Sequence, residues 1–433
     1  MIPQDNFTIL AEVGQDNIDR LRALLATMTL PEFPGAADPH NRLAPFGAFD
    51  TIHFARFVIL ADNTLSDRAA YPQLPREEPT YLCLMVDCDG DATALLSQMA
   101  REWPGLRRVF GFCAGFDPNA DLERWLAAHR VRPSASYVNW VGRSVVQARE
   151  EARLHDLLRD ALLDAADREP QRRFDQLRRA VGNRAPLTPI PPTPPNWRLR
   201  NLAHFLAPVV IALACLIFFP RVTILLSLIG LVVFLLALRR HEQQDPIVLD
   251  AYDAAWVAKL RLGEDHDVTN QYTAMGSIKP GRFRLCLELV VLYGVNWAAR
   301  HIATRGALGR IGTIHFAHWV FLDSRRRGFF CSNYDGGHEA YMDDFINKAG
   351  FGLNVSFSSY IAYPRTDWLI AKGAWREQEF KLFQRHHQIP TDVWYKAYPG
   401  LTARDLARNT RIRNGFEKAA MSDDEIRRWL AEI

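Results

Sequence analysis

Histidines recur at matched positions in two stretches of the chain. His53 lies in "TIHFARFVIL" (51–60), and His315 lies in "TIHFAHWVFL" (313–322). A buried neutral imidazole can ligate haem or a metal, or act as a general base. The alternative is a core histidine that is hydrogen-bonded to a neighbouring element. His318 stands three residues after His315 on an expected strand, so the two face opposite sides and no shared metal site is expected.

A group of polar residues follows the second histidine. Asp335–Gly336 matches Asp89–Gly90, and in both places aspartate can cap a helix while glycine supplies a tight turn. The functional alternative makes Asp335 an acid or base beside the N–H groups of a helix N-terminus. Since the second copy is the richer one, we expect His315, Asp335 and Asn333 to act catalytically there. Its polar residues are Asn333, Tyr334, Asp335, His338 and Glu339.

The segment "RHHQIPTDVWYKAYPG" (385–400) concentrates further candidates. His386 is predicted to join the catalytic group. Trp394 and Tyr398 are predicted to bind a cofactor together with His53 and His315, by forming one wall of a pocket for a flat or lipidic ligand. The alternative is structural: histidines favour the negative end of a helix dipole, and the aromatic residues pack a strand.

Both stretches predict the element order β-α-β-β-α-β, which is the ferredoxin-like pattern. Each then adds a helix and a strand, within 120–142 and 376–400. The strand 51–60 is apolar on both faces and needs a second layer. We therefore expect an α+β fold of two ferredoxin-like modules that pack their sheets as a pseudo-dimeric α+β barrel, within one chain or between two. The expected strands are 6–13, 51–60, 80–87 and 107–116, then 270–278, 313–322, 328–335 and 352–363; the expected helices are 15–28, 91–103, 281–303 and 338–350.

An apolar block at 203–238 separates the two copies. It is about twice the roughly 20 residues that one bilayer span requires. Pro220 and Arg221 divide it, because proline breaks a helix and arginine is costly in hydrocarbon. Arginines flank both ends, which predicts a transmembrane hairpin with both modules in the cytoplasm at a bacterial inner membrane. A re-entrant hairpin and a buried soluble hairpin are the alternatives.

The domain boundaries follow from these segments. The bulk composition adds little: a net charge of +3 with dispersed basic residues predicts no nucleic-acid partner, and six scattered cysteines favour reduced thiols. No cleaved signal peptide, P-loop, HExxH or GxSxG motif is found. The expected divisions are module 1 (1–146), an amphipathic helical segment (147–184), a Pro-rich linker (185–200), the transmembrane hairpin (201–240), a connecting helix (241–264), module 2 (265–418) and a C-terminal helix (419–433).

This arrangement resembles the dimeric α+β barrel group, which includes dye-decolourising peroxidases, chlorite dismutase-like proteins and small monooxygenases. The segments "IHFAR/HxV", "SNYDGG" and "PTxVWYKAYPGLT" are also similar to a bacterial membrane-associated family. The resemblance covers about 1–146 and 265–418. Dye-decolourising peroxidases carry a GxxDG motif and a proximal haem histidine, whereas "SNYDGG" lacks the leading glycine.

The resemblance implies a membrane-anchored oxidoreductase that faces the cytoplasm. Its activity would be peroxidase-like, with haem as a possible cofactor and a hydrophobic or membrane-borne small molecule as substrate. A function of a different class fits the same architecture, namely a non-catalytic scaffold that holds a lipid or a protein at the bilayer.

Overall fold

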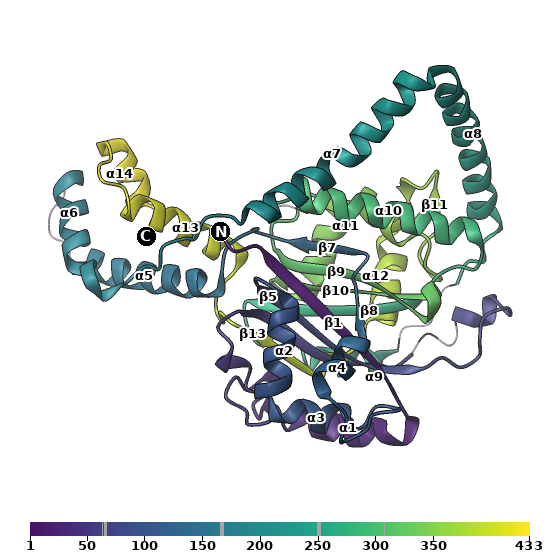
Figure 1. Cartoon of the computed structure of the whole chain (residues 1–433), viewed down its shortest axis with the longest axis horizontal. Helices are drawn as coiled ribbons and strands as arrows, with labels where there is room; N and C mark the ends of the chain where they lie inside the picture. Colours follow the sequence, from purple (N-terminus) through teal and green to yellow (C-terminus); the bar gives the residue numbers. More distant parts are fainter. Residues whose placement is uncertain (63, 65–66, 165–168, 249–252, 307) are drawn as a thin grey trace.

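The computed structural model of the chain describes residues 1–62, 64, 67–164, 169–248, 253–306 and 308–433. It is a mixed α+β protein in which two sheets form the body and a long helical hairpin projects from one side of it (Figure 1). The predicted α+β class is confirmed at this level.

The larger sheet is built mostly from the N-terminal part of the chain. Its strand order is β2-β3-β13-β4-β5-β1-β6, with β5 antiparallel to both β1 and β4. Leucines and phenylalanines of the helices share one apolar core with this sheet. The strands are β1 (Gln4–Val13), β2 (Thr29–Leu30), β3 (Phe33–Ala37), β4 (Ile52–Leu60), β5 (Thr80–Asp89), β6 (Arg130–Val131) and β13 (Val393–Lys396); the helices are α1 (Ile18–Ala26), α2 (Ala92–Glu102), α3 (Pro104–Phe110) and α4 (Leu122–Ala128).

The smaller sheet has the order β7-β9-β10-β8, and β10 is antiparallel to both β8 and β9. It has its own apolar core with its helices. The strands are β7 (Ala135–Val138), β8 (Thr269–Ser277), β9 (Ile314–Leu322) and β10 (Arg327–Asp335); the helices are α10 (Arg282–His301), α11 (His338–Phe357) and α12 (Glu377–His387). A short hairpin of β11 (Thr366–Asp367) and β12 (Ala371–Lys372) follows α11.

Each sheet receives a strand from the other part of the chain. β7 comes from the N-terminal part but pairs with β9, while β13 comes from the C-terminal part but pairs with β4. The two pairings are matched, because Tyr137 lies opposite Ala317 and Tyr395 lies opposite Ala55. This reciprocal exchange ties the two sheets together through backbone hydrogen bonds.

A separate apolar cluster joins the two sheets. It combines side chains of β1, β4 and β5 with side chains of β8, β9 and β10, so it lies between the sheets. This cluster explains why β4 is apolar on both faces: one face packs on helices and the other on the second sheet. Its fully buried members include Val58, Leu60, Met85, Val320 and Cys331.

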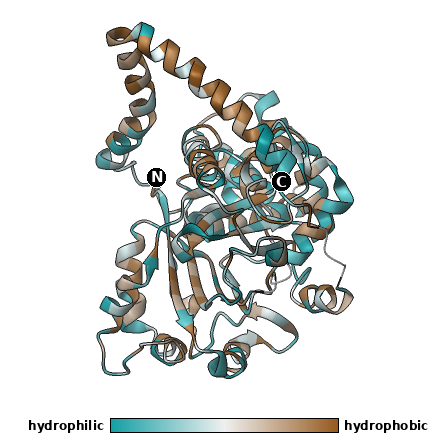
Figure 2. Cartoon of the chain, turned by 90° about the vertical axis from the view of Figure 1, so that its right-hand side faces the viewer, coloured by the Kyte–Doolittle hydropathy of each residue, from teal (hydrophilic) through white to brown (hydrophobic). Residues whose placement is uncertain are grey.

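The helical hairpin consists of α7 (Pro195–Phe218) and α8 (Pro220–Gln244), which meet at Phe219. Both helices are long and apolar enough to cross a membrane, and almost none of their apolar surface is buried. Figure 2 shows the hydrophobic residues continuing along both arms. The predicted division at Pro220 is confirmed.

Four helices form a small body beside the sheets. They are α5 (Val145–Asp164), α6 (Pro170–Val181), α13 (Ala403–Phe416) and α14 (Asp423–Leu430), and they share a core around Leu154, Leu177 and Trp429. The predicted segment 147–184 is therefore helical and packs on the chain itself, although its residues 165–168 lie outside the described ones. The predicted connecting helix 241–264 is instead the end of α8 followed by α9 (Ala254–Arg261), and residues 249–252 lie outside the described ones.

Two predicted strands are wrong. Residues 107–116 begin inside α3, whose N-terminus is set by Pro104 at the first helical position. Residues 352–363 begin inside α11, which continues to Phe357 because its apolar residues keep a helical spacing. In each place an isolated β-bridge is found where the last strand of the β-α-β-β-α-β pattern was expected. The bridges join Val13 to Cys113 and Ile278 to Tyr360.

Candidate functional site

The two predicted histidines meet at one small cavity. His53 and His315 line it together with Tyr398 and Arg143, and its volume is about 20 Å³. The backbone places them there because each lies at an irregularity in strand pairing. The register shifts between Ile52 and Phe54 in β4, and it shifts between Asn333 and Tyr334 opposite β9, so both histidines are skipped in the ladder. Such bulges redirect a side chain.

Each of these histidines pairs with an aspartate. His53 Nε2 lies 3.0 Å from Asp89 Oδ1, and His315 Nε2 lies 2.6 Å from Asp335 Oδ1. The second carboxylate oxygen accepts a backbone N–H at a helix start, from Val145 for Asp89 and from Ala403 for Asp335, both at 2.8 Å. The aspartates therefore orient the imidazoles and also accept the first N–H of α5 and α13.

The glycine after each aspartate has the expected positive φ, 79° at Gly90 and 85° at Gly336. The predicted capping role needs one correction. Asp335 does not cap the adjacent α11 but accepts the first N–H of the distant α13, whose N-cap is Thr402; Asp89 likewise accepts the first N–H of α5, while Asp91 caps α2. The aspartates thus connect parts of the chain that are far apart in sequence.

Tyr398 forms a hydrogen bond with His53. Its hydroxyl lies 3.1 Å from His53 Nδ1, so both ring nitrogens of His53 have partners. Burial raises the pKa of Tyr398 well above its ordinary value, although the nearby Arg143 opposes the shift. Burial also lowers the pKa of Arg143 to about 10. The neutral phenol therefore keeps its proton and can donate or accept a hydrogen bond with His53.

Asn333 and Trp394 lie away from this cavity. Asn333 Oδ1 accepts hydrogen bonds from Trp394 Nε1 at 3.0 Å and from the Arg56 guanidinium. Arg56 also donates to the carbonyls of Tyr272 and Ser332, so it crosses from β4 to the other sheet. The predicted catalytic role of Asn333 beside His315 is thus not supported by any shared contact.

His386 is also separate from His315. It lies on α12, where its Nε2 is 3.2 Å from Asp67, and the neighbouring His387 Nε2 is 2.9 Å from the same carboxylate. The predicted catalytic group therefore divides into three places. His315, Asp335, His53 and Tyr398 are together, Asn333 and Trp394 form a second group, and His386 forms a third.

A much larger cavity of about 390 Å³ lies beside Trp394. Its apolar wall comes from β3 and the segments next to it, together with β13. The residues of this wall include Leu30, Phe33, Pro39, Trp394, Tyr395 and Pro399. Its size falls within the range of pockets that hold a small organic molecule. The predicted pocket wall in the segment 385–400 corresponds to this cavity, with Trp394 in it and Tyr398 outside it.

One ion pair stands among the apolar walls of this cavity. Lys396 Nζ contacts Asp267 Oδ2, which also accepts the N–H of Gly400 at 2.9 Å. Burial lowers the pKa of Lys396, although Asp267 opposes the shift. The pKa of Asp267 is lowered despite its burial, because it accepts these hydrogen bonds. Lys396 Nζ also lies 5.0 Å from the centre of the Trp394 ring, so the charge and the indole face the same space.

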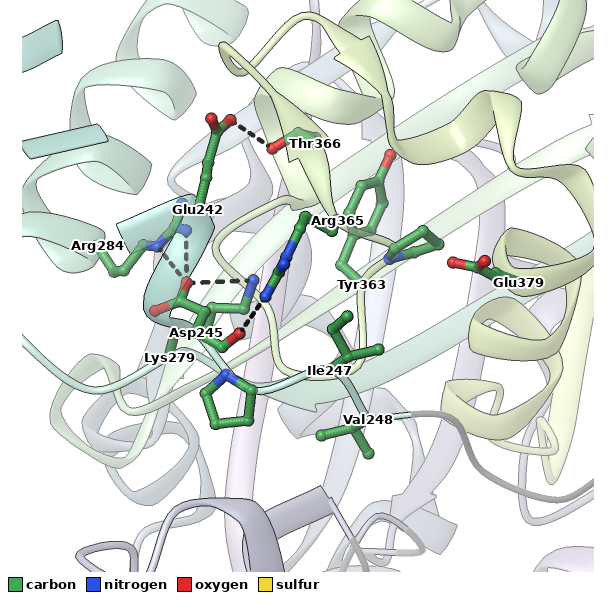
Figure 3. Close-up of a pocket in the computed structure, with 12 residues that line it drawn as sticks. Glu242, Asp245, Ile247, Val248, Lys279, Arg284, Tyr363, Arg365, Thr366 and Glu379 are labelled. Atoms are coloured by element: carbon green, nitrogen blue, oxygen red, sulfur yellow. Dashed lines mark hydrogen bonds and ion pairs between the residues drawn. The ribbon is translucent and has the colours of Figure 1, made fainter. Parts of the chain in front are cut away.

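A third, polar cavity of about 20 Å³ lies at the end of α8 (Figure 3). Asp245 Oδ2 accepts two hydrogen bonds from Arg284, at 3.1 and 2.5 Å, and Lys279 Nζ lies 3.6 Å from it. Burial lowers the pKa of Lys279 to about 7. Glu242 accepts the backbone N–H groups of Trp368 and Leu369 at 2.9 and 2.7 Å. These contacts connect the end of α8 to α10 and to the β11–β12 hairpin.

The sequence interpretation missed Lys396 and Asp267 as partners, and it did not weigh Arg56 as a link between the sheets. The available signal for Arg56 was its charge inside an otherwise apolar strand, where burial requires hydrogen-bond partners. No local signal pairs Lys396 with Asp267, because 128 residues separate them. Among the described residues, no group of three or more His, Cys, Asp or Glu side chains is placed to hold a metal ion.

These features define a mixed α+β protein with an attached apolar helical hairpin. No protein-family model, curated protein or solved structure matched the chain. Its function is therefore argued from the geometry of the two cavities and of the hairpin.

Proposed function

We propose that the chain is a membrane-anchored binding protein for a flat, largely apolar small molecule that carries one anionic group. The observation that supports this most is the cavity of about 390 Å³, in which the Trp394 indole and the Lys396 ammonium face the same space. The indole and Phe33 would stack on the rings of the ligand. The ligand's anionic group would share Lys396 with Asp267.

The architecture behind this proposal is a pair of ferredoxin-like modules that act as an intramolecular pseudo-dimer. Three matched features support it: the strand orders β1-β5-β4 and β8-β10-β9, the bulged histidines, and the exchange of β7 and β13. The ligand cavity lies where the exchanged β13 meets β3 and the start of β8. It therefore exists only when both modules are paired.

The hairpin would hold this body at a bacterial inner membrane with both modules in the cytoplasm. The arginines that flank the hairpin support this orientation, since positive residues stay on the cytoplasmic side. They are Arg198, Arg200, Arg239 and Arg240. Phe219 and Pro220 at the tip would then reach the opposite face of the bilayer.

The binding proposal is tested with the full chain in lipid nanodiscs and with 2-naphthoate, a flat apolar carboxylate. Calorimetric titration is expected to show saturable binding at one site per chain. Gly263 lines the cavity, and a Cβ there would meet only carbonyl oxygens 3.8 and 4.0 Å away. Gly263→Leu should therefore fill the cavity without moving the backbone and should remove binding. Gly352→Leu, at a helical glycine with nothing within 4 Å, is the matched control.

Neutral 2-methylnaphthalene tests the part assigned to Lys396. The wild type should bind 2-methylnaphthalene more weakly than it binds 2-naphthoate. A Lys396→Met variant should bind the two compounds with equal affinity. Equal binding of 2-naphthoate to the wild type and to Gly263→Leu would place the ligand elsewhere and contradict the proposal.

The predicted oxidoreductase activity is kept as a second candidate, and His315 is its specific residue. The cavity beside His315 has room for about one water molecule, since a water occupies at least roughly 10–15 Å³ by this measure. Both ring nitrogens of His53 are engaged. This geometry favours ligand binding over haem ligation. A Soret band after haem is offered, lost in His315→Gln and retained in His386→Gln, would reverse that preference.

A further inference from the structure

Helix α10 carries apolar residues on the side turned away from the sheet. Val290 is 71% exposed and Tyr293 is 53% exposed, while Leu287, Val291 and Leu292 on the opposite side are buried. A helix that is apolar all round normally lies inside a protein or a membrane. The outer side of α10 therefore needs a second apolar environment that the described residues do not supply.

Both helices of the hairpin contact α10. Phe205 of α7 stacks on Trp297 of α10 with ring centres 5.4 Å apart. Phe234 of α8 lies 6.0 Å from Phe283, near the other end of α10. In Figure 1, α10 thus runs beneath the arch that α7 and α8 make. The exposed side of α10 is continuous at both ends with surfaces apolar enough to enter a bilayer.

The β11–β12 hairpin packs on the same junction of α8 and α10. Leu369 packs into the core that joins α8 to α10, while Trp368 and Ile370 beside it are 49% and 48% exposed. Trp368 has a φ of 54° and Leu369 has a φ of 66°, both in the left-handed region. The N–H bonds to Glu242 hold this strained turn, so the exposed position of Trp368 is built into the fold.

Cations stand at the edge of this surface. The Arg239 guanidinium lies 5.3 Å from the centre of the Trp368 ring, and Lys372 ends the β11–β12 hairpin. Asp367 between them is paired with both. Arg282 begins α10 and is exposed. Aromatic residues next to long cationic side chains are the arrangement found where a protein meets lipid headgroups.

We propose that this surface, made of Val290 and Tyr293 of α10 with Trp368 and Ile370 of the β11–β12 hairpin, lies in the headgroup and acyl boundary of a lipid bilayer. The chain would then touch the membrane in two ways, by the spanning hairpin and by an interfacial helix that lies in the membrane plane. The interfacial contact would fix the orientation of the body relative to the bilayer. This proposal is independent of the ligand cavity, but it requires the hairpin to be in the membrane.

Nitroxide accessibility in the full chain tests the proposal. The exposed Cys215 and Cys286 are first replaced by alanine, because the other four cysteines are buried. Single cysteines are then introduced as Val290→Cys and Ile370→Cys, labelled, and placed in nanodiscs of phosphatidylcholine and phosphatidylglycerol. Leu231→Cys on α8 is the spanning control. Leu163→Cys, at a position 83% exposed on α5, is the aqueous control.

The ratio of oxygen to nickel-chelate collision rates is expected to be higher at Val290 and Ile370 than at Leu163 and to approach the ratio at Leu231, because the apolar face of an interfacial helix lies about 5–10 Å inside the headgroup and acyl boundary. Water-like ratios at both positions, with a lipid-like ratio at Leu231, would overturn the proposal. Exclusion of both reagents at Val290 would also overturn it, since a protein partner or a second copy would then cover the surface. A water-like ratio at Leu231 would overturn the membrane anchor and this proposal together.

Discussion

The two sheets are joined by two matched cross-links of different chemistry. At one, Arg56 of β4 reaches Asn333 of β10; at the other, His318 of β9 reaches Asp87 of β5, with Nε2 and Oδ1 2.6 Å apart. The positions correspond, because Asp87 lies opposite Phe54 and Asn333 lies opposite Phe316 in the strand pairing. The two corresponding positions thus hold a fixed cation with neutral acceptors at one cross-link and an imidazole with a carboxylate at the other.

This difference separates the features that the two sheets share from those in which they differ. Both have a bulged histidine paired with an aspartate, and each aspartate also accepts an N–H at a helix start. The cross-links vary, and so do the exchanged strands: Ser136 supports His318 at 3.1 Å, whereas the corresponding Trp394 bonds to Asn333 and lines the large cavity. The large cavity therefore lies on the side of the molecule where the cross-link has no carboxylate.

The largest expected effect is at Arg56, which is 3% exposed. Arg56→Met removes the guanidinium donor from the Tyr272 and Ser332 carbonyls, and it leaves Asn333 Oδ1 with only the Trp394 indole as a donor. We expect the free energy of unfolding to fall by about 4 kcal/mol, because buried acceptors are left unpaired. Chemical unfolding in detergent, followed by near-UV circular dichroism, measures this.

Arg56→His combined with Asn333→Asp copies the other cross-link into this place. The double variant should recover about half of the loss, since an imidazole–carboxylate pair restores one strong contact but reaches fewer acceptors. A double variant no more stable than Arg56→Met would show that the two cross-links are not interchangeable.

The next effect concerns the starts of the exchanged strands, where Asp392 before β13 corresponds to Ser134 before β7. Burial raises the pKa of Asp392 to about 6, while the Ile59 N–H and Arg22 oppose this. The folded state therefore favours the protonated acid. Stability from this group is present below about pH 4 and is lost as the pH rises through about 6, a cost of about 3 kcal/mol.

Asp392→Asn keeps an acceptor for Ile59 and removes the charge. It should therefore be more stable than the wild type at pH 7, with a difference that shrinks toward pH 4.5. Asp19→Asn is the control, because that side chain is 97% exposed. An Asp392→Asn variant less stable than the wild type at pH 7 would mean that Arg22 compensates for the buried carboxylate.

A smaller effect separates the two histidine–aspartate pairs. Asp335→Asn and Asp89→Asn each weaken one contact to a histidine and one to a helix start, and Asp335→Asn also weakens the contact to the Thr269 hydroxyl, so each should cost about 2 kcal/mol. The loss should be greater at Asp335, because its contact to His315 is 2.6 Å long against 3.0 Å for Asp89 and His53. Thermal unfolding of both variants under one condition compares them. Equal losses would mean that helix capping, which the two share, carries the effect.

The sequence predicted those parts of the structure that local patterns determine. The repeated "TIHFA" segments gave matched strands, the apolar block with Pro220 gave the hairpin, and the histidine–aspartate matches located one cavity. The prediction of a strand at 107–116 was wrong because Pro104 starts a helix there. The local apolar content does not distinguish a short helix from a strand.

Contacts between residues that are far apart in the sequence could not be predicted from local patterns. The alignment of the repeats places Tyr398 after the added strand, but it does not reveal that this strand crosses to the other sheet. That crossing brings Tyr398 to His53 and places Trp394 at the large cavity. His386 was grouped with His315 by residue type alone, and its partner Asp67 comes from a distant loop.

The smallest expected effect tests the asymmetry at the shared cavity. The Ala397 N–H bonds to the His53 carbonyl and the Asn139 N–H bonds to the His315 carbonyl, so Tyr398 and Trp140 occupy corresponding positions. Only Tyr398 offers a hydroxyl, and Trp140 instead stacks with Arg143, 4.2 Å from its ring centre. Tyr398→Phe removes one hydrogen bond and keeps the ring, which should cost about 1 kcal/mol. If the bond fixes the His53 tautomer, the ring-proton NMR signals of His53 should shift while those of His315 stay in place. Equal shifts at both histidines would show that the two respond as one unit through the cavity they share.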